Sequence, residues 1–176
     1  VHVAAKNNLA EKNGLALNFV EKVYDVPFAR SPKSLDNLKA YLQLKKIIEK
    51  EQYDVIHCNT PMGGIVTRLA AKKSRKLGTK VYYTAHGFHF YKGAPKKNWI
   101  VFYPIEKLFS RITDKIITIT AEDYRLAQQK FHCHIERIHG VGVDEKRYFP
   151  VNEDEKQELR TRMGFDKEQK LILCTG

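Results

Sequence analysis

The residues best suited to chemistry lie close together in one short stretch of the chain. Residues 83–93 have the sequence YTAHGFHFYKG, with two histidines, several aromatic side chains and a lysine. A neutral imidazole donates one hydrogen bond and accepts another, which suits the hydroxyl groups of a polyol. His86 directly follows a predicted strand and is the stronger candidate, whereas His89 fits a structural role equally well. The alternative is that the aromatic rings fill a core and the histidines are only hydrogen-bonded.

A second candidate site follows another predicted strand. Residues 59–64 have the sequence NTPMGG and lead into a predicted helix. Free backbone amides at a helix start can face an anion or a sugar hydroxyl, and glycine allows a ligand to approach closely. The same glycines fit a purely geometric role in the turn. The stretch matches neither the Walker loop nor the dinucleotide-binding fingerprint.

Short apolar runs alternate with segments of helical periodicity, and these elements must position the candidate residues. The predicted strands lie at residues 1–5, 18–26, 54–58, 80–84, 115–119 and 135–138, and the predicted helices at 35–52, 65–77, 99–112, 122–131 and 152–163. This alternation predicts an α/β fold with a doubly wound, mostly parallel sheet and helices on both faces. Such sheets bind ligands outside the carboxyl ends of their strands, here after Cys58, Thr84, Thr120 and His139.

A change in composition after Pro150 predicts a domain boundary. Residues 1–150 would form one domain, and residues 151–176 would contain a linker helix and the first strand of another, at 171–174. The linker helix is acidic at its start and basic at its end, as the helix dipole favours. Both ends of the sequence are apolar runs typical of buried strands, so we expect it to be a piece of a longer protein.

The composition is that of a globular protein with a strong positive charge. Apolar residues make up 43% of the 176 residues, which is enough for a packed core, and no run approaches the length of a membrane span. Residues 1–150 hold 26 basic and 14 acidic residues and therefore carry a charge of +12. This charge favours nucleic acid, an anionic bilayer or phosphorylated substrates. Three widely spaced cysteines indicate reduced thiols in a cytoplasmic protein.

Several classes of site are disfavoured by spacing. The histidines and cysteines form loose clusters, but adjacent His57 and Cys58 would point to opposite faces of a strand, and no Cys-x-x-Cys pair exists. We therefore expect no metal site. No nucleophile elbow and no known nucleic-acid-binding module is present.

Four groups of residues together resemble a known family. They are residues 53–61 (YDVIHCNTP), residues 83–95 (YTAHGFHFYKGAP), residues 98–107 with Asn98-Trp99 and Tyr103-Pro104-Ile105-Glu106-Lys107, and residues 140–144 (GVGVD). The pattern resembles the N-terminal domain of bacterial group 1, or family-four, glycosyltransferases of the capsular and exopolysaccharide branch. It covers most of residues 1–150.

The resemblance implies a GT-B architecture, in which two Rossmann-like domains face a cleft and this chain is most of the first. The sheet would lack its first strand, which would precede Val1. The implied reaction is a retaining, metal-independent hexosyl transfer, with no cofactor, from a nucleotide diphosphate sugar to a saccharide acceptor that is usually lipid-linked. The donor-binding half would lie beyond Gly176, so we expect the chain alone to be inactive.

The resemblance also implies roles for individual residues. His86 would contact the transferred sugar, and Gly87 would allow close approach. The acceptor side would be lined by Asn59, Thr60, Gly63, Gly64 and Lys92, and the floor of the cleft by Gly140, Gly142 and Asp144. In the family the position of Asn59 is often histidine, and an amide cannot titrate near neutral pH.

Two kinds of partner follow from charge and resemblance together. The nucleotide sugar and the acceptor are substrates, and an anionic inner membrane surface would attract the basic domain, mainly through Lys92, Lys96 and Lys97. No nucleic acid is expected. The alternatives left open are a GT-B enzyme such as a nucleotide-sugar 2-epimerase, a basic nucleic-acid-binding module and a non-catalytic sugar- or partner-binding domain.

Overall fold

The computed structural model describes residues 1–6, 20–140, 142, 144–166 and 168–172 of the chain. Its contacts divide the chain into two compact units, residues 1–140 and 141–176. The division lies somewhat before the boundary predicted at Pro150. The acceptor-side and donor-side roles assigned to the two parts stay predictions. None of the helices in the described part of the chain has the length and apolar character needed to cross a bilayer.

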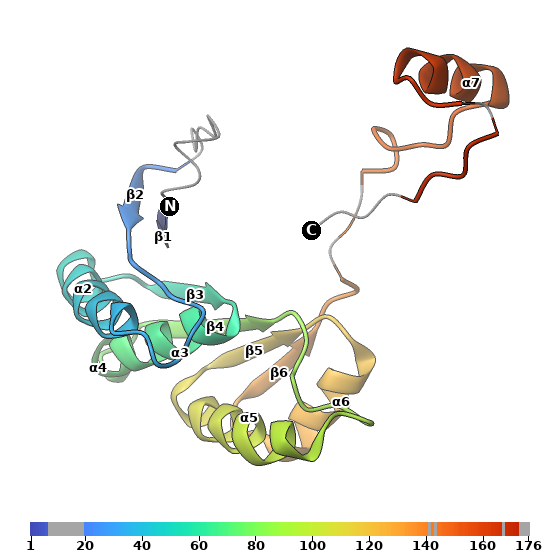
Figure 1. Cartoon of the computed structure of the whole chain (residues 1–176). Helices are drawn as coiled ribbons and strands as arrows, with labels where there is room; N and C mark the ends of the chain where they lie inside the picture. Colours follow the sequence, from blue (N-terminus) through green and yellow to red (C-terminus); the bar gives the residue numbers. More distant parts are fainter. Residues whose placement is uncertain (7–19, 141, 143, 167, 173–176) are drawn as a thin grey trace. The chain divides into compact units, whose positions relative to one another are not determined.

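Six parallel strands in the first unit carry the fold. A two-stranded sheet pairs β1 (His2–Ala5) with β2 (Lys22–Asp25), and a four-stranded sheet has the order β3 (Val55–Asn59), β4 (Lys80–Ala85), β5 (Lys115–Thr118) and β6 (His134–Arg137) (Figure 1). Each strand coincides with a predicted one, with its ends shifted by a few residues. The predicted parallel, Rossmann-like α/β class is therefore confirmed.

The two sheets flank a cavity. It has a volume of about 520 Å³ and lies between β1 and β3, both of which line it along their length. Among the described residues, β1 pairs only with β2 and β3 only with β4. A parallel strand between β1 and β3 would join the two sheets into one. The expectation that the sheet lacks its first strand agrees with this cavity and stays a prediction.

Helices follow the strands in the predicted order. They are α2 (Asp36–Glu51), α3 (Pro61–Ala70), α4 (Lys72–Lys76), α5 (Lys96–Phe109), the short 3₁₀ helix η1 (Ser110–Ile112), α6 (Ala121–Lys130) and, in the second unit, α7 (Glu153–Arg162). The helix predicted at 65–77 begins earlier, at Pro61, because proline is favoured in the first turn of a helix. It is also divided at Ala71 into α3 and α4. Leu171 and Ile172 are not in a strand, and the rest of the strand predicted at 171–174 lies outside the described residues.

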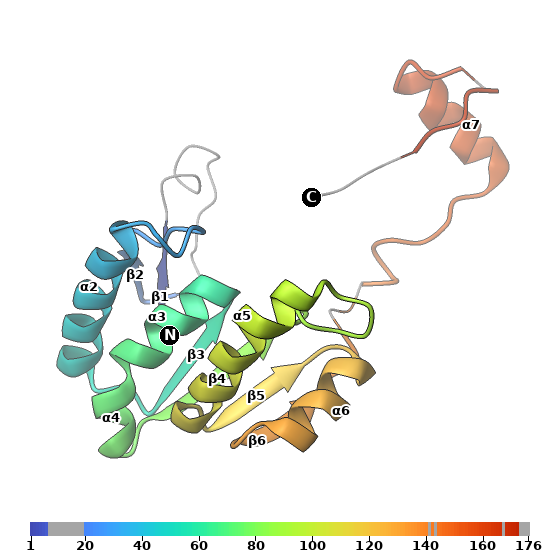
Figure 2. The same cartoon turned by 60° about the horizontal axis from the view of Figure 1, so that its bottom comes forward.

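The helices of the first unit lie side by side along the sheets (Figure 2). Under α3, α5 and α6, alternate strand residues such as Tyr83 and Ile116 are buried. The neighbouring residues along the same strands, such as Tyr82 and Ile117, lie on the opposite face and are less buried. Strand alternation thus separates a packed face from a face that carries polar side chains.

A buried ion pair joins α3 to α5 beneath the sheet. Arg68 is fully buried and makes two hydrogen bonds to the carboxylate of Glu106, at 2.9 and 3.3 Å. Its guanidinium also lies 4.2 Å from the ring centroid of Tyr83, and its Nε donates to the carbonyl oxygen of Gly64. Each of the three guanidinium nitrogens therefore donates a hydrogen bond, and Glu106 supplies the counter-charge. A buried charge is tolerated when it is paired and hydrogen-bonded in this way.

Removal of one partner from this pair should strongly destabilise the first unit. Glu106→Gln leaves the guanidinium of Arg68 buried without a counter-charge, and we expect a loss of about 3–5 kcal/mol in the free energy of unfolding. The matched control is Glu49→Gln, which breaks an exposed pair with Lys73 at 3.4 Å and should cost less than about 1 kcal/mol. Urea denaturation followed by circular dichroism measures both. Equal losses in the two variants would contradict the structural role of the buried pair.

Candidate active site at the carboxyl ends of β3 and β4

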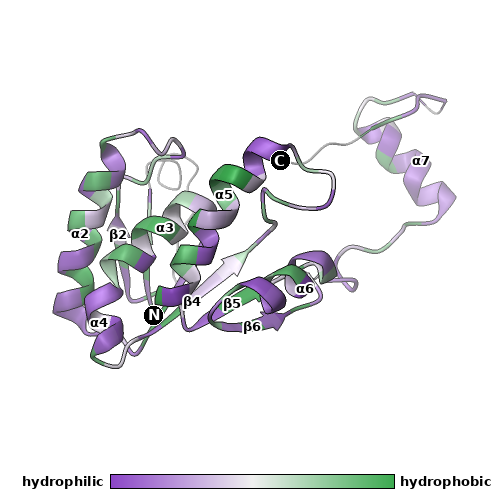
Figure 3. Cartoon of the chain, turned by 90° about the horizontal axis from the view of Figure 1, so that it is seen from below, coloured by the Kyte–Doolittle hydropathy of each residue, from purple (hydrophilic) through white to green (hydrophobic). Residues whose placement is uncertain are grey.

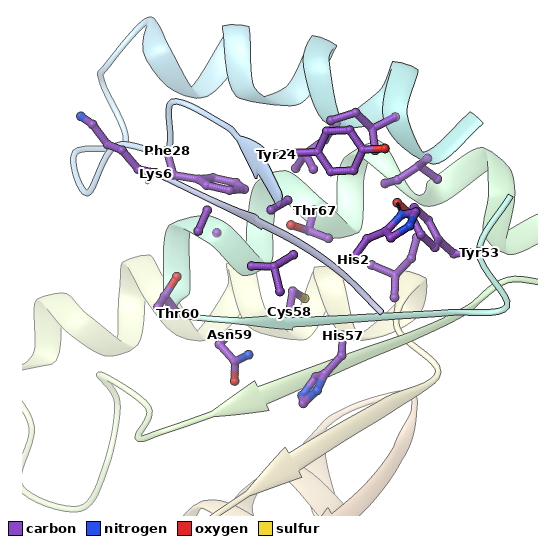
Figure 4. Close-up of a pocket in the computed structure, with 18 of the residues that line it drawn as sticks. His2, Lys6, Tyr24, Phe28, Tyr53, His57, Cys58, Asn59, Thr60 and Thr67 are labelled. Atoms are coloured by element: carbon purple, nitrogen blue, oxygen red, sulfur yellow. Dashed lines mark hydrogen bonds between the residues drawn. The ribbon is translucent and has the colours of Figure 1, made fainter. Parts of the chain in front are cut away.

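The two stretches singled out in the sequence meet at one edge of the four-stranded sheet. Strands β3 and β4 are parallel, with Asn59 paired in register with Thr84, so both strands end at the same edge. His86 follows Ala85, the last residue of β4, and is exposed. Figure 4 shows His57 and Asn59 leaving β3 on the face opposite to Cys58. The sheet therefore collects polar side chains from two strands on one face.

Two hydrogen-bonded pairs form this polar cluster. His86 Nε2 lies 3.3 Å from Asn59 Oδ1, and His57 Nε2 lies 2.7 Å from Thr84 Oγ1. An amide oxygen can only accept, so this hydrogen bond requires a proton on His86 Nε2, and in the neutral ring with that tautomer Nδ1 is an acceptor. An exposed imidazole fixed in this way can accept a hydrogen bond from a sugar hydroxyl. The hydrogen bond to Asn59 thus favours one orientation of the imidazole.

The electrostatics of the cluster differ between its two histidines. Partial burial holds the pKa of His57 below its ordinary value of 6.5, and the nearby His86 lowers it further. A neutral His57 can donate to or accept from the hydroxyl of Thr84. Because His86 lowers the pKa of His57, simultaneous protonation of the two imidazole rings is disfavoured.

The turn after β3 has an unusual backbone. Thr60 has a φ of 64° and a ψ of 147°, a region that residues other than glycine rarely adopt, and it directly precedes the first turn of α3. Strain of this kind is concentrated at functional sites and costs on the order of 1–3 kcal/mol. A Cβ on Gly63 would lie 2.7 Å from Thr60 Oγ1, so the turn also needs a glycine there.

Gly64 has a packing role. It is buried, and a Cβ on it would lie 2.7 Å from Cε2 of the Tyr83 ring. The missing side chain lets α3 approach β4 closely. The geometric interpretation therefore applies to both glycines, and Gly63 also lines the cavity beside the site.

One end of the cavity between β1 and β3 opens beside the polar cluster. Lys6, Asn59, Thr60 and Gly63 are among its lining residues, and Figure 4 shows Lys6 and Thr60 near the same end. His2 and Tyr53 lie at the other end, where His2 Nδ1 and the Tyr53 hydroxyl are 2.7 Å apart. Lys6 adds a positive charge at the carboxyl edge of β1, which favours an anionic ligand there.

The loop that follows His86 is anchored to the core and to α6. Phe88 and Phe90 are buried with their rings stacked 4.9 Å apart, so these aromatic residues do fill a core. The backbone amide of Lys92 donates to Glu122 Oε1 at 2.7 Å, in the acidic first turn of α6. These contacts hold the loop while His86 stays exposed.

The other candidate residues lie in different places. Gly87 has a φ of 152°, which glycine adopts without strain, and nothing lies near its missing side chain. His89 packs on Phe102, with ring centroids 4.7 Å apart. Lys92 lines a separate groove with Trp99, Tyr103, Glu122 and Arg125.

The predicted floor of the cleft spans the division between the two units. Gly140 ends the first unit, while Gly142 and Asp144 belong to the second. Asp144 accepts hydrogen bonds from the backbone amides of Lys146 and Arg147, so its side chain stabilises its own turn. The proposed contribution of these three residues to a cleft stays a prediction.

Three residues of the candidate site were not predicted from the sequence: His57, Thr84 and Lys6. Strand periodicity contains a signal for the first two, because His57 precedes Asn59 by two residues and Thr84 precedes His86 by two, which places each pair on one face. Lys6 follows an apolar run and carries no distinguishing pattern. Lys6 is found near the site only in the structure, where β1 pairs with β2 and lines the same cavity as β3.

The described cysteines and histidines form no metal cluster. Cys58 is buried, and burial raises its pKa to about 12. Cys133 is partly buried, and the same cause raises its pKa to about 11. Within the described residues, no group of three or more histidine, cysteine or acidic side chains is arranged to hold a metal ion. Cys174 lies outside the described residues.

The titration of His57 tests the geometry of the polar cluster. We expect a His57 pKa below 6.5 and a partial rise in the His86→Gln variant, because burial, the larger cause of the shift, is unchanged. Histidine ¹H–¹⁵N NMR spectra recorded against pH measure both values. The unfolded chain takes up this proton first, so folding should become less favourable as the pH falls below about 6.5. A His57 pKa at or above 6.5 would contradict the arrangement.

Comparisons with known proteins identify the family of the chain. Residues 1–147 match the family Glycosyltransferase Family 4. The chain is 46% identical over 175 residues to EpsD of Bacillus subtilis (strain 168), which is named as a glycosyltransferase; this match covers 98% of the chain and 44% of EpsD. It is 25% identical over 152 residues to an Escherichia coli protein, UDP-Gal:alpha-D-GlcNAc-diphosphoundecaprenol alpha-1,3-galactosyltransferase, with 82% and 38% of the two chains covered. The chain thus spans less than half the length of these relatives.

A solved structure shows the same fold. The UDP-N-acetylglucosamine 2-epimerase from Rickettsia bellii superposes with a TM-score of 0.60 at 17% identity, over 94% of this chain and 43% of the epimerase. At this identity the likeness concerns the fold alone. The family match over residues 1–147 and the 46% identity to EpsD show that the chain belongs to glycosyltransferase family 4, as its motifs predicted.

Proposed function

We propose that the protein containing this chain transfers a hexosyl unit from a nucleotide diphosphate sugar to a lipid-linked saccharide during the synthesis of a bacterial surface polysaccharide. Family membership supports glycosyl transfer. The name of the Escherichia coli relative supports the finer part, since that protein is named for galactosyl transfer to a diphosphoundecaprenol-linked sugar. The reaction would take place at the inner face of the cell membrane.

The observation that carries the proposal is the exposed pair of His86 and Asn59 at the carboxyl edge of the sheet. In parallel α/β sheets this edge is where ligands bind. His86 presents a fixed hydrogen-bonding nitrogen, and Gly87 beside it places no side chain in the way of a sugar ring. We assign His86 to the transferred sugar on these grounds.

The acceptor side of the proposed site uses the turn after β3. Asn59, Thr60 and Gly63 line the mouth of the cavity, where amide, hydroxyl and backbone groups can bind sugar hydroxyls. Lys6 adds a positive charge suited to a diphosphate. Gly64 is left out of this role because it is buried against Tyr83.

Replacement of His86 should impair turnover without unfolding the protein. In the whole protein, His86→Ala should lower kcat about 10- to 1,000-fold, the range for loss of one group that orients or stabilises the reacting sugar. The melting temperature should stay nearly unchanged, since His86 is exposed. The assay pairs uridine and guanosine diphosphate hexoses with a synthetic GlcNAc-diphospholipid, and product analysis separates transfer from epimerisation of the donor.

His89→Ala is the matched control. This histidine is exposed on the same loop, but its ring packs on Phe102 instead of contacting Asn59. It should retain activity within about threefold, well short of the loss expected for an orienting group. Activity within a factor of two for His86→Ala, or equal losses in the two variants, would remove His86 from the proposed role.

The stereochemical course and the absence of a metal requirement form a separate prediction. The reaction should retain the anomeric configuration of the donor sugar, and activity should survive dialysis against a chelator. Without a divalent cation, helix N-termini and basic side chains must stabilise the leaving diphosphate. ¹H NMR of the product glycosidic linkage and an activity assay after EDTA treatment test both parts. An inverted anomer, or activity restored only by Mg²⁺ or Mn²⁺, would contradict the prediction.

A further inference from the structure

A groove between α5 and α6 is separate from the cavity that opens beside the polar cluster. Its volume is about 610 Å³, and it shares no lining residue with that cavity. Both helices and the loop before α5 contribute side chains to it. The lining includes Trp99, Tyr103, Glu122, Arg125, Gln129 and Lys130. We call this feature the α5–α6 groove.

Two aromatic side chains form the apolar part of the α5–α6 groove. Trp99 and Tyr103 are one helical turn apart on α5, with ring centroids 5.8 Å apart, and both are partly exposed. Each also packs on the buried ring of Phe90, at centroid distances of 5.7 and 5.6 Å. The core therefore holds both rings in place while they line the groove. Apolar ring surface of this kind can pack against the C–H groups on one face of a sugar ring.

The polar part of the α5–α6 groove is positively charged. Arg125 and Lys130 on α6 and Lys92 in the loop are exposed, and within the described part of the chain their side chains form no ion pair or hydrogen bond. Figure 3 shows most of α6 as hydrophilic, whereas α5 becomes hydrophobic after its first turn. Three cations against the one carboxylate of Glu122 leave a charge of +2. The groove therefore complements an anionic ligand, and the guanidinium of Arg125 has the geometry to bind a carboxylate through two hydrogen bonds.

Hydrogen bonds tie both sides of the α5–α6 groove to the loop that follows His86. Trp99 Nε1 donates to the carbonyl oxygen of Tyr91 at 3.3 Å, and the backbone amide of Lys92 donates to Glu122 Oε1 at 2.7 Å. These contacts fix the groove before any ligand arrives, which lowers the entropic cost of binding. A ligand in the groove thus contacts the side chains that hold this loop.

We propose that the α5–α6 groove is a second, non-catalytic site that binds an acidic saccharide, with a sugar ring on Trp99 and Tyr103 and its carboxylate on Arg125. Apolar rings with a few well-placed polar groups are typical of small-ligand sites. The choice of a saccharide among anionic ligands rests on the proposed function, since an enzyme that extends a polysaccharide meets such chains. The groove then holds sugar units away from the reacting end of the chain.

The first part of the test measures binding and its dependence on charge. Isothermal titration calorimetry of the whole protein, without any nucleotide sugar, compares tetragalacturonate with the neutral saccharide maltotetraose. Tetragalacturonate should bind more tightly, and Arg125→Gln combined with Lys130→Gln should weaken its binding at least about 10-fold, because hydrogen bonds from two charged groups are lost. The matched control is Lys72→Gln with Lys76→Gln on α4, which removes the same charge from exposed positions elsewhere. The control should bind within about twofold of the unchanged protein.

The second part of the test locates the bound saccharide. Trp99 is the only tryptophan in the chain, so its indole ¹H–¹⁵N signal reports on the groove. The signal is assigned by its loss in Trp99→Phe. We expect it to shift as tetragalacturonate is added, and to shift in the same way in His86→Ala, because His86 does not line the groove.

Three results would overturn the saccharide site: equal affinity for the acidic and the neutral saccharide, equal losses in the α6 variant and its control, or an unchanged Trp99 signal. Displacement of tetragalacturonate by an equal concentration of a tetraglutamate peptide or of uridine diphosphate would also overturn it, and would assign the groove to a peptide or a nucleotide. Binding needs no catalysis, so a protein that binds tetragalacturonate in the groove but transfers no sugar contradicts only the proposed function. A protein that transfers sugar without such binding contradicts only the groove.

Discussion

The candidate site depends on a buried ion pair that fixes α3, α5 and β4 relative to one another. Arg68 from α3 binds Glu106 from α5 while stacking on Tyr83 of β4, and it also binds the carbonyl oxygen of Gly64 in the first turn of α3. A guanidinium buried this deeply is tolerated only if every hydrogen-bond donor and the charge itself are matched. The pair therefore leaves α3 little freedom to shift, and the turn at Thr60 that precedes α3 is held in place with it.

Strand pairing then completes the site. The parallel register of β3 and β4 sets Asn59 beside Thr84, and the pleat puts His57, Asn59 and Thr84 on one face. His86 needs no further element, because it follows β4 and reaches back to Asn59. The loop beyond it is secured by buried phenylalanines and by the first turn of α6. An exposed, oriented imidazole thus stands on a rigid base, as binding of a sugar hydroxyl requires.

Local sequence patterns predicted the helices and strands and the two main candidate stretches. They did not predict contacts between residues that are far apart in the sequence. Apolar runs located the strands, and the stretch around His86 was distinctive enough to identify the family and to indicate a candidate site. Arg68 and Glu106 lie 38 residues apart, and nothing in either segment indicates the other as its partner. The role of Gly64 depends on the Tyr83 ring of a later strand. Pro61 was predicted in a turn because a proline marks either a turn or a helix start, and only the packing of α3 decides between them.

We propose that sugars bind at the carboxyl edge of β3 and β4, in contact with His86. The most direct measurement is a crystal structure of the whole protein with a bound nucleotide sugar and an acceptor analogue. We expect a His86 ring nitrogen within about 3 Å of a hydroxyl of the transferred sugar, with Asn59 still hydrogen-bonded to the ring. A sugar bound away from this edge, with His86 facing only solvent, would contradict it.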